Sequence, residues 1–175
     1  MPTPDRTSLA EIVAAGRSLI EEGGAPRLTM QAVADRVGVR PPSLYKRVRD
    51  RDALLVLVAE ATVDDLSQRL TASDGTLGGL AHAYRAFAHA RPEGFRLMFA
   101  VDGAAGSLER VSAPILRVAR DLVGEDAALE AARLITAWAT GFIDMELAGA
   151  FRLGGDVDRA FEFGLDRLER GLRAA

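Results

Sequence analysis

The chain has 175 residues, 49% of them hydrophobic, with 22 basic and 25 acidic side chains and a net charge of −3. This length and apolar content allow one compact unit or two small ones with an ample core. The sequence contains no run of eighteen apolar residues, so it predicts no membrane span. The absence of cysteine excludes disulfides and thiolate metal sites, and the N-terminus has no secretory signal, so we expect a cytoplasmic protein.

The positive charge is concentrated near the N-terminus. Residues 1–55 carry nine cations and seven anions, whereas residues 56–175 carry thirteen cations and eighteen anions. Within 36–51 there are six cations and a single anion, Asp50. A local basic face of this kind favours contact with phosphates, although the net charge of the whole chain is negative.

The first helix is expected at about 8–22. Ser8 and Glu11 have the spacing of a capping box, and apolar residues recur from Leu9 at helical spacing. Gly23 and Gly24 should end this helix. Residues 1–6 are expected to lack regular structure, and Arg6 is a weak candidate for contact with a DNA backbone.

The stretch from Thr29 to Arg51 predicts two short helices joined by a tight turn. Thr29 is a good N-cap, and Gly38 follows the first helix where a left-handed residue is needed. Pro41 opens the second helix, in which Leu44 and Val48 should face inward. The outward positions are occupied by Ser43, Tyr45, Lys46 and Arg47. A short, exposed, basic helix of this kind is suited to a DNA groove.

Six more helices and no strand are expected after this stretch, which makes the fold all-α with about nine helices. Asp50 and Asp156 should cap two of them, Pro114 should kink one helix or mark its start, and residues 102–107 should form a loop. The expected ranges are about 51–70, 76–90, 92–99, 108–123, 126–150 and 157–172.

The last two helices have contrasting patterns. The helix over 126–150 is apolar nearly all round, so it should be buried on several sides. The final helix has one apolar stripe, which we interpret as part of a subunit interface where Gly164 permits close approach. The stripe consists of Phe161, Leu165, Leu168 and Leu172.

The helix-turn-helix stretch resembles the TetR family of bacterial transcriptional repressors. The shared positions are Thr29, Val33-Ala34, Val37-Gly38-Val39, Leu44-Tyr45 and a basic turn that leads into Ala53-Leu54-Leu55. The chain departs from the family pattern at Arg40, where the family often has a capping Ser. It departs again at Val48, which is often Phe, and at Arg51, which is often Lys.

The second half resembles the C-terminal domain of a TetR subgroup with a Trp-His-Gly signature. The matching segment is Trp138-Ala139-Thr140-Gly141-Phe142, in which Thr140 replaces the His.

The TetR resemblance implies a helix-turn-helix DNA-binding domain over 1–54 and a ligand-binding and dimerisation domain over 55–175. It implies a homodimeric repressor, paired through the last two helices and released from a palindromic operator in double-stranded DNA by a small, largely hydrophobic effector. The expected DNA contacts are Thr29, Arg40, Ser43, Tyr45, Lys46, Arg47 and Arg51. The residues that could line an effector cavity, or else form plain core, are Tyr84, Phe87, Phe95, Met98, Phe99, Trp138, Phe142 and Met145. Thr140 and Asp144 could hold the polar end of the effector.

Other functions fit the sequence less well. His82 and His89 share a helix face and could bind a metal, but no Glu-x-x-His pair accompanies them. Asp144 and Glu146 are two residues apart, so they cannot form an acid/base pair on one face, and Asp64-Asp65 is expected to be a solvated pair. No nucleophile elbow, phosphate loop or dinucleotide fingerprint is present. We therefore expect neither an enzyme nor a cofactor. The remaining alternative is a transcriptional activator, or a DNA-binding protein controlled by a partner protein.

Overall fold

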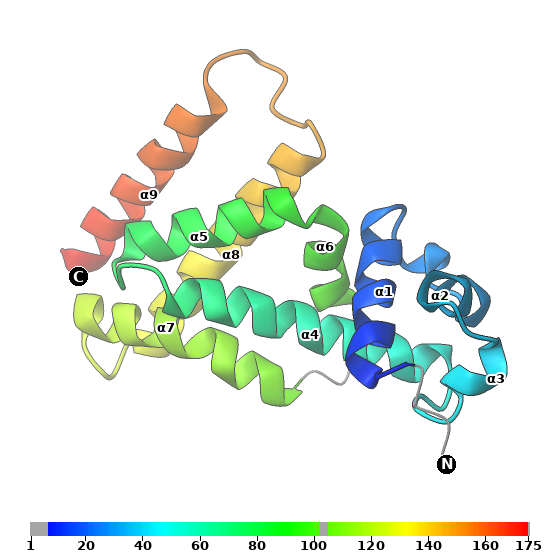
Figure 1. Ribbon diagram of the computed structural model, residues 1–175. Coiled ribbons are helices and arrows are strands. Elements are labelled where there is room, and N and C mark those ends of the chain that lie inside the picture. The colour runs from blue at the N-terminus through cyan, green and yellow to red at the C-terminus, as the bar shows by residue number, and fades with distance from the viewer. Residues whose placement is uncertain (1–6, 102–104, 175) are drawn as a thin grey trace. The chain divides into compact units, whose positions relative to one another are not determined.

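Every regular element in the described chain is a helix, which confirms the predicted all-α fold. A computed structural model describes residues 7–101 and 105–174, and these ranges contain nine α-helices, one 3-10 helix and no strand (Figure 1). The elements are α1 (Leu9–Glu21), η1 (Ala25–Arg27), α2 (Met30–Val37), α3 (Pro41–Leu44), α4 (Arg51–Thr71), α5 (Leu77–Ala90), α6 (Pro92–Ala100), α7 (Ala105–Val123), α8 (Ala128–Leu147) and α9 (Val157–Arg173). The predictions for Arg6 and for residues 102–104 lie outside the described ranges.

The helix ends follow the local chemistry of the sequence. The Ser8 hydroxyl accepts from the Glu11 amide at 3.2 Å, and the Glu11 carboxylate accepts from the Ser8 amide at 2.7 Å. The Thr29 hydroxyl accepts from the Ala32 amide at 3.1 Å, and Gly38 is left-handed with φ 73°. Each partner lies within four residues of the cap, so these ends could be predicted from the sequence.

Two elements differ from the sequence prediction. The second helix of the helix-turn-helix is only the single α-helical turn Pro41–Leu44, followed by a tighter turn in which the Arg47 amide donates to the Leu44 carbonyl at 2.8 Å. No side chain caps this helix at Arg40, as expected. The helix α7 already begins at Ala105, so the loop expected to extend through residue 107 is shorter, and α7 continues through Pro114 rather than starting there.

The chain forms two compact units. One comprises the described residues of Met1–Asp65 and Arg91–Leu108, and the other those of Leu66–Ala90 and Glu109–Ala175. These units describe packing only, and the functional division between residues 54 and 55 remains a prediction.

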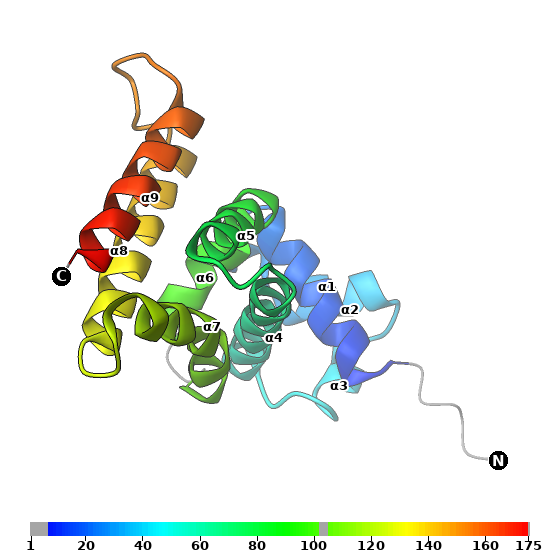
Figure 2. The ribbon, with the colours of Figure 1, turned by 90° about the vertical axis from the view of Figure 1, so that its left-hand side faces the viewer.

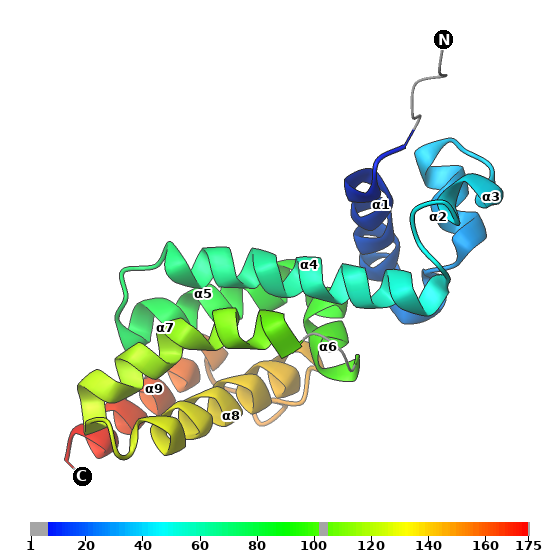
Figure 3. The ribbon, with the colours of Figure 1, turned by 90° about the horizontal axis from the view of Figure 1, so that it is seen from below.

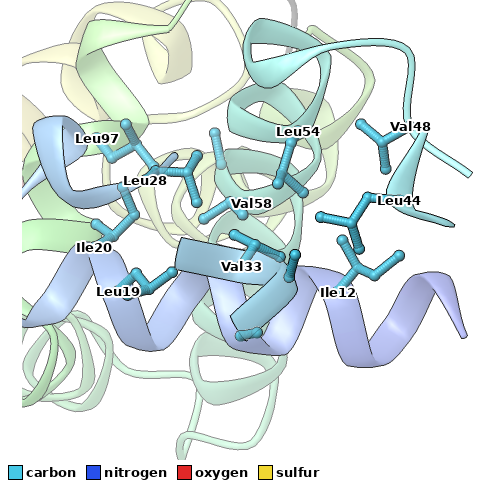
Figure 4. Packing of buried hydrophobic residues seen from close by; sticks show 13 residues of the cluster. Ile12, Leu19, Ile20, Leu28, Val33, Leu44, Val48, Leu54, Val58 and Leu97 are labelled. Atoms are coloured by element: carbon cyan, nitrogen blue, oxygen red, sulfur yellow. The ribbon is translucent and has the colours of Figure 1, made fainter. Parts of the chain in front are cut away.

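The first unit is built around a core that joins the helix-turn-helix to α1, α4 and α6. Figure 4 shows its buried side chains converging between α1, α2 and α4. They include Ile12, Leu19, Ile20, Leu28, Val33, Leu44, Val48, Leu54, Val58 and Leu97. Burying each of these side chains contributes roughly 1.5–3 kcal/mol before the entropy cost of ordering it. The helix α3 is short, and it is fixed through Leu44, whose side chain is fully buried. Figure 3 shows α1 and α2 side by side, with α3 following α2.

The second unit contains the helical hairpin α8–α9, with α5 packed against both helices (Figure 2). Phe161 is fully buried and its ring lies 5.2 Å from both the Trp138 and the Phe142 rings. Leu165 is also buried, and Leu172 packs on an alanine cluster of α7 and α8. The apolar stripe of α9 therefore packs inside its own chain, and our reason for placing it in a subunit interface was wrong.

The helix α8 is buried along one side only, which corrects the expectation of burial on several sides. Its buried residues are Ala128, Ala131, Ala132, Ile135, Ala139 and Ile143. Leu134 and Met145 on another side are 50% and 49% exposed. Apolar side chains thus remain uncovered on α8 in the single chain. None of the helices within the described ranges has the length and apolar character needed to cross a membrane.

Candidate DNA-binding interface and effector site

The helix-turn-helix presents one exposed face. Gly38 allows the chain to turn sharply between α2 and α3, and the Val39 amide closes the turn by donating to the Ala34 carbonyl at 3.0 Å. Leu44 and Val48 are buried beneath α3. The exposed side chains are those predicted to contact DNA: Arg40, Ser43, Tyr45, Lys46 and Arg47. Burial of one side and exposure of the other is the arrangement that a groove-reading helix requires.

Several cations in this stretch are already paired with acids. The Arg36 guanidinium donates to both Glu22 carboxylate oxygens at 2.8 and 2.9 Å, which lowers the pKa of Glu22. Asp50 accepts from the Ala53 amide at 2.8 Å and from Arg49 at 2.6 Å, and these two bonds lower its pKa. Arg36 and Arg49 are therefore partly neutralised before any phosphate approaches.

Thr29 is exposed at the start of α2. Its hydroxyl oxygen is occupied by the Ala32 amide, but the hydroxyl hydrogen is still able to donate to an acceptor such as a phosphate. Capping and phosphate contact are therefore compatible at this residue.

Arg51 has a structural role that the sequence did not reveal. Its Nε donates to the Leu28 carbonyl and its Nη2 donates to the Ala25 carbonyl, each at 2.7 Å. Its Nη1 lies 3.4 Å from Asp52. Arg51 therefore ties the first residue of α4 to η1 and to the segment that leads into α2. The two carbonyls lie 23 and 26 residues away along the chain, so no local spacing indicates them.

The predicted effector residues are divided between the two units. Phe95, Met98 and Phe99 lie on α6 in the first unit. Phe95 is fully buried, whereas Phe99 is 60% exposed and meets the Phe95 ring edge-on at 5.5 Å. The other five predicted residues lie on α5 and α8 in the second unit.

The polar centre of the second group is the pair Tyr84 and Thr140, whose hydroxyls lie 2.9 Å apart. Burial raises the pKa of Tyr84 to about 12, and the charge of Asp144 acts in the same direction. The Tyr84 phenol is therefore a neutral hydrogen-bonding group at physiological pH.

The other predicted effector residues of the second unit have different surroundings. Phe87 is fully buried, with the Arg69 guanidinium 5.5 Å from the centre of its ring. Trp138 and Phe142 are half-buried and pack on Phe161 of α9. Met145 is 49% exposed. Trp138 and Phe142 thus join α8 to α9, a packing role that the sequence analysis left open.

Charged side chains next to this group tie three helices together. Arg85 of α5 donates to Glu146 of α8 at 2.9 and 2.5 Å and to Asp158 of α9 at 2.6 Å. Its guanidinium also lies 4.8 Å from the centre of the Phe161 ring. The bonds from Arg85, assisted by His89, lower the pKa of Glu146. The role of Arg85 could not be predicted from the sequence, because its partners are 61 and 73 residues away.

Acidic residues and histidines that had been considered for other roles also have protein partners. His82 lies 3.2 Å from Glu162, and His89 lies 3.1 Å from Glu146. Within 7–101 and 105–174, no group of three or more His, Asp or Glu side chains could hold a metal ion. Asp65 is paired with Arg17 of α1 at 2.6 Å, so it is not the freely solvated residue that was expected.

Comparisons with known proteins agree with this arrangement. Residues 12–58 match the family described as "Bacterial regulatory proteins, tetR family", and residues 77–168 match the "Tetracyclin repressor-like, C-terminal domain". The uncharacterised HTH-type transcriptional regulator Rv0681 of Mycobacterium tuberculosis is 27% identical over 183 residues, which cover 97% of this chain and 83% of the relative.

Solved structures share the fold. A protein described as a possible TetR family transcriptional regulator from Streptomyces coelicolor A3(2) has a TM-score of 0.73 and 25% identity, with 94% of this chain and 98% of that chain covered. A TetR variant from Acinetobacter baumannii AYE, crystallised with minocycline, has a TM-score of 0.71 and 23% identity, with 96% and 97% covered. With both halves matched, the chain belongs to the TetR family and is a transcriptional regulator with a helix-turn-helix DNA-binding domain.

Proposed function

We propose that the protein is a repressor that binds a palindromic operator through α3 and the turn that follows it. The observation that carries this proposal is the exposed face of Arg40, Ser43, Tyr45, Lys46 and Arg47 above the buried Leu44 and Val48. In the bound complex, Lys46 and Arg47 enter the major groove or its rim, Arg40 and Ser43 meet base edges, and Tyr45 and Thr29 donate to phosphates. Arg51 holds a phosphate at the start of α4 through Nη1, while its other two nitrogens keep their carbonyl partners.

The DNA proposal is tested by selecting duplexes from a random pool with the purified protein and sequencing them. We expect enrichment of a palindrome with half-sites about one helical turn apart, or a multiple of this spacing. Transcription from a promoter that carries the selected site is then measured with and without the protein, which distinguishes a repressor from an activator. A repressor lowers transcription, and an activator raises it.

The proposed active form is a homodimer joined through α8 and α9. The outer sides of the hairpin support this, because Leu134, Met145 and Phe163 are 50%, 49% and 62% exposed. Gly141 and Gly171 lie on the same helices, and a Cβ added at either position would have no neighbour within 4 Å, so another backbone can approach closely. Sedimentation at micromolar concentration should show a dimer, and the double substitution Met145→Glu with Phe163→Glu should convert it to a monomer.

We further propose that a small, largely apolar effector binds in the C-terminal half and releases the DNA. The support is the half-buried, neutral Tyr84–Thr140 pair beside the aromatic side chains of α8, together with the minocycline complex of a protein with the same fold. Such an effector must bind the DNA-incompetent form more tightly than the DNA-binding form. Equal affinity for both forms would leave the equilibrium between them unchanged. The ordinary range of coupling is about 1–3 kcal/mol.

A thermal-shift screen of metabolites, followed by Trp138 fluorescence, tests the effector proposal. A hit should release DNA and change the emission of this single tryptophan. A regulator under the control of a partner protein would yield no such hit. The proposal includes no catalytic activity and no cofactor, so a hit should be recovered chemically unchanged, and we place the protein in the cytoplasm.

A further inference from the structure

The N-terminus of α6 is capped from outside the helix. Its N-cap residue, Arg91, makes no side-chain capping bond. Instead the carboxylate of Glu21, the last residue of α1, accepts from the Gly94 amide at 3.0 Å and from the Glu93 amide at 3.3 Å. Free amides at a helix N-terminus carry partial positive charge, so a carboxylate is the group best suited to satisfy two of them.

Two glycines at this junction leave room for neighbouring side chains. A Cβ on Gly94 would lie 2.7 Å from the Glu21 Oε1 and 3.2 Å from the Thr62 Cγ2. A Cβ on Gly24, just after α1, would lie 3.1 Å from the Glu93 carboxylate. The ends of α1 and α6 are therefore interlocked, and Thr62 of α4 lies against the same point.

The rest of α6 is anchored in the same core as the helix-turn-helix. Leu97 is 5% exposed and belongs to the cluster that includes Ile20 and Leu28 (Figure 4). The preceding helix, α5, ends at Ala90, and the boundary between the two compact units falls between Ala90 and Arg91.

We infer that Glu21 is a positioning residue that couples the DNA-binding helices to α6. Its carboxylate transmits a change in the position of α1 to the first turn of α6, and a displacement of α6 to α1. This inference rests on the proposed DNA binding. It assigns no DNA contact to α6, so any effect of DNA on α6 must pass through the protein.

Hydrogen exchange read by mass spectrometry tests the coupling, with a duplex selected from a random pool as the probe. In the wild-type protein, DNA should slow exchange both in a peptide that covers α3 and in one that covers 92–100. Coupling between two sites is reciprocal, so this second protection is the expected sign of it. Without DNA, Glu21→Ala should speed exchange at 93–94 by about tenfold, because two amides lose their acceptor.

The variants separate a coupling role from a merely structural one. Glu21→Ala, Glu21→Gln and Gly94→Ala should lose most of the DNA-dependent protection of 92–100 while α3 is still protected. The control variants should keep this protection. Glu22→Gln removes the neighbouring charge that pairs with Arg36, and Gly78→Ala adds a methyl whose nearest neighbour is 3.8 Å away. If Glu21→Ala does not fold, Glu21→Gln and Gly94→Ala decide the result.

The possible failures are distinguishable. Protection of α3 without protection of 92–100 in the wild type overturns the coupling, and so does full protection of 92–100 in the Glu21 variants. If no duplex is selected or α3 stays unprotected, the proposed DNA binding fails. In that case, if exchange at residues 93–94 is as slow in DNA-free Glu21→Ala as in the wild type, the claim that Glu21 caps α6 also fails.

Discussion

The indole ring of Trp138 occupies the space that a side chain at Gly164 would need. A Cβ at residue 164 would lie 3.0 Å from the Trp138 Cε2 and 3.2 Å from its Nε1, with Cζ2 closer still. The ring can therefore stack on Phe161, one turn earlier on α9, at 5.2 Å and an interplanar angle of 26°. Gly164 thus serves packing within the hairpin, although its sequence context suggested contact between subunits.

Gly164→Ala should displace the indole and lower the free energy of unfolding by about 1–3 kcal/mol, the usual cost of overpacking. Trp138 emission should change at the same time, because its contact with Phe161 is disturbed. Gly78→Ala, also in a helix of the second unit, is the matched control and should be neutral or stabilising. Equal stability of the two variants would show that α8 and α9 are less closely packed than described.

Arg85→Met should destabilise the protein by roughly 1.5–3 kcal/mol near neutral pH, because Glu146 would keep its charge while 13% exposed and without its main partner. Arg170→Met removes an exposed pair with Asp166 and should cost at most about 1 kcal/mol. Urea unfolding at pH 7 measures both changes.

The Arg85–Glu146 pair also predicts that the stability of the fold depends on pH in the acid range. Since Arg85 lowers the pKa of Glu146 in the folded state, its stabilisation is present above the unfolded carboxyl value of 4.5 and is lost as pH falls through the folded pKa. Arg85→Met should therefore lose less stability than the wild type over this acid range. A parallel loss in both proteins would contradict the assignment.

Tyr84 should remain protonated to about pH 12. In Tyr45→Phe it is the only tyrosine, so absorbance at 295 nm reports it alone. Because the folded pKa is raised above the unfolded value of 10.0, the stabilisation is complete below pH 10 and is lost as pH rises towards about 12. The loss is on the order of 2–3 kcal/mol for this largely buried group. Titration at the ordinary tyrosine value while the protein is still folded would rule out the half-buried Tyr84–Thr140 pair.

Lys46 should contact a phosphate, so its contribution to DNA affinity should depend on the salt concentration. Its replacement by Ala should reduce the slope of log affinity against log salt by about 0.9 per lysine, and so by about 1.8 for a dimer. Arg36→Ala should change the slope little, because Arg36 is paired with Glu22. Equal slopes for both variants would show that Lys46 does not meet phosphates.

Much of the fold could be predicted because its signals are local. Ser8, Thr29 and Asp156 each cap a helix by accepting from an amide three residues ahead, and such spacing is visible in the sequence. The apolar stripe of α9 was also visible, but a stripe does not reveal its partner. That partner proved to be Trp138 and Phe142 of the same chain.

The long-range polar contacts could not be predicted. Glu21 reaches Gly94 across 73 residues, and Arg51 reaches two backbone carbonyls that any residue could supply. Which acid meets which amide or arginine depends on how the helices pack, and one sequence contains no signal for that. The exposed face proposed to contact DNA was easier to predict, because burial of Leu44 and Val48 determines which neighbouring side chains point outward.

The most direct test is the affinity of the purified protein for its selected palindrome, measured by fluorescence anisotropy together with the stoichiometry. We predict two chains per palindrome for the wild type and a loss of at least about 100-fold for the combined Tyr45→Ala, Lys46→Ala and Arg47→Ala variant. The three side chains are exposed, so the unfolding temperature of this variant should stay close to that of the wild type. Unchanged affinity in a folded triple variant would show that α3 and the turn after it do not read the DNA.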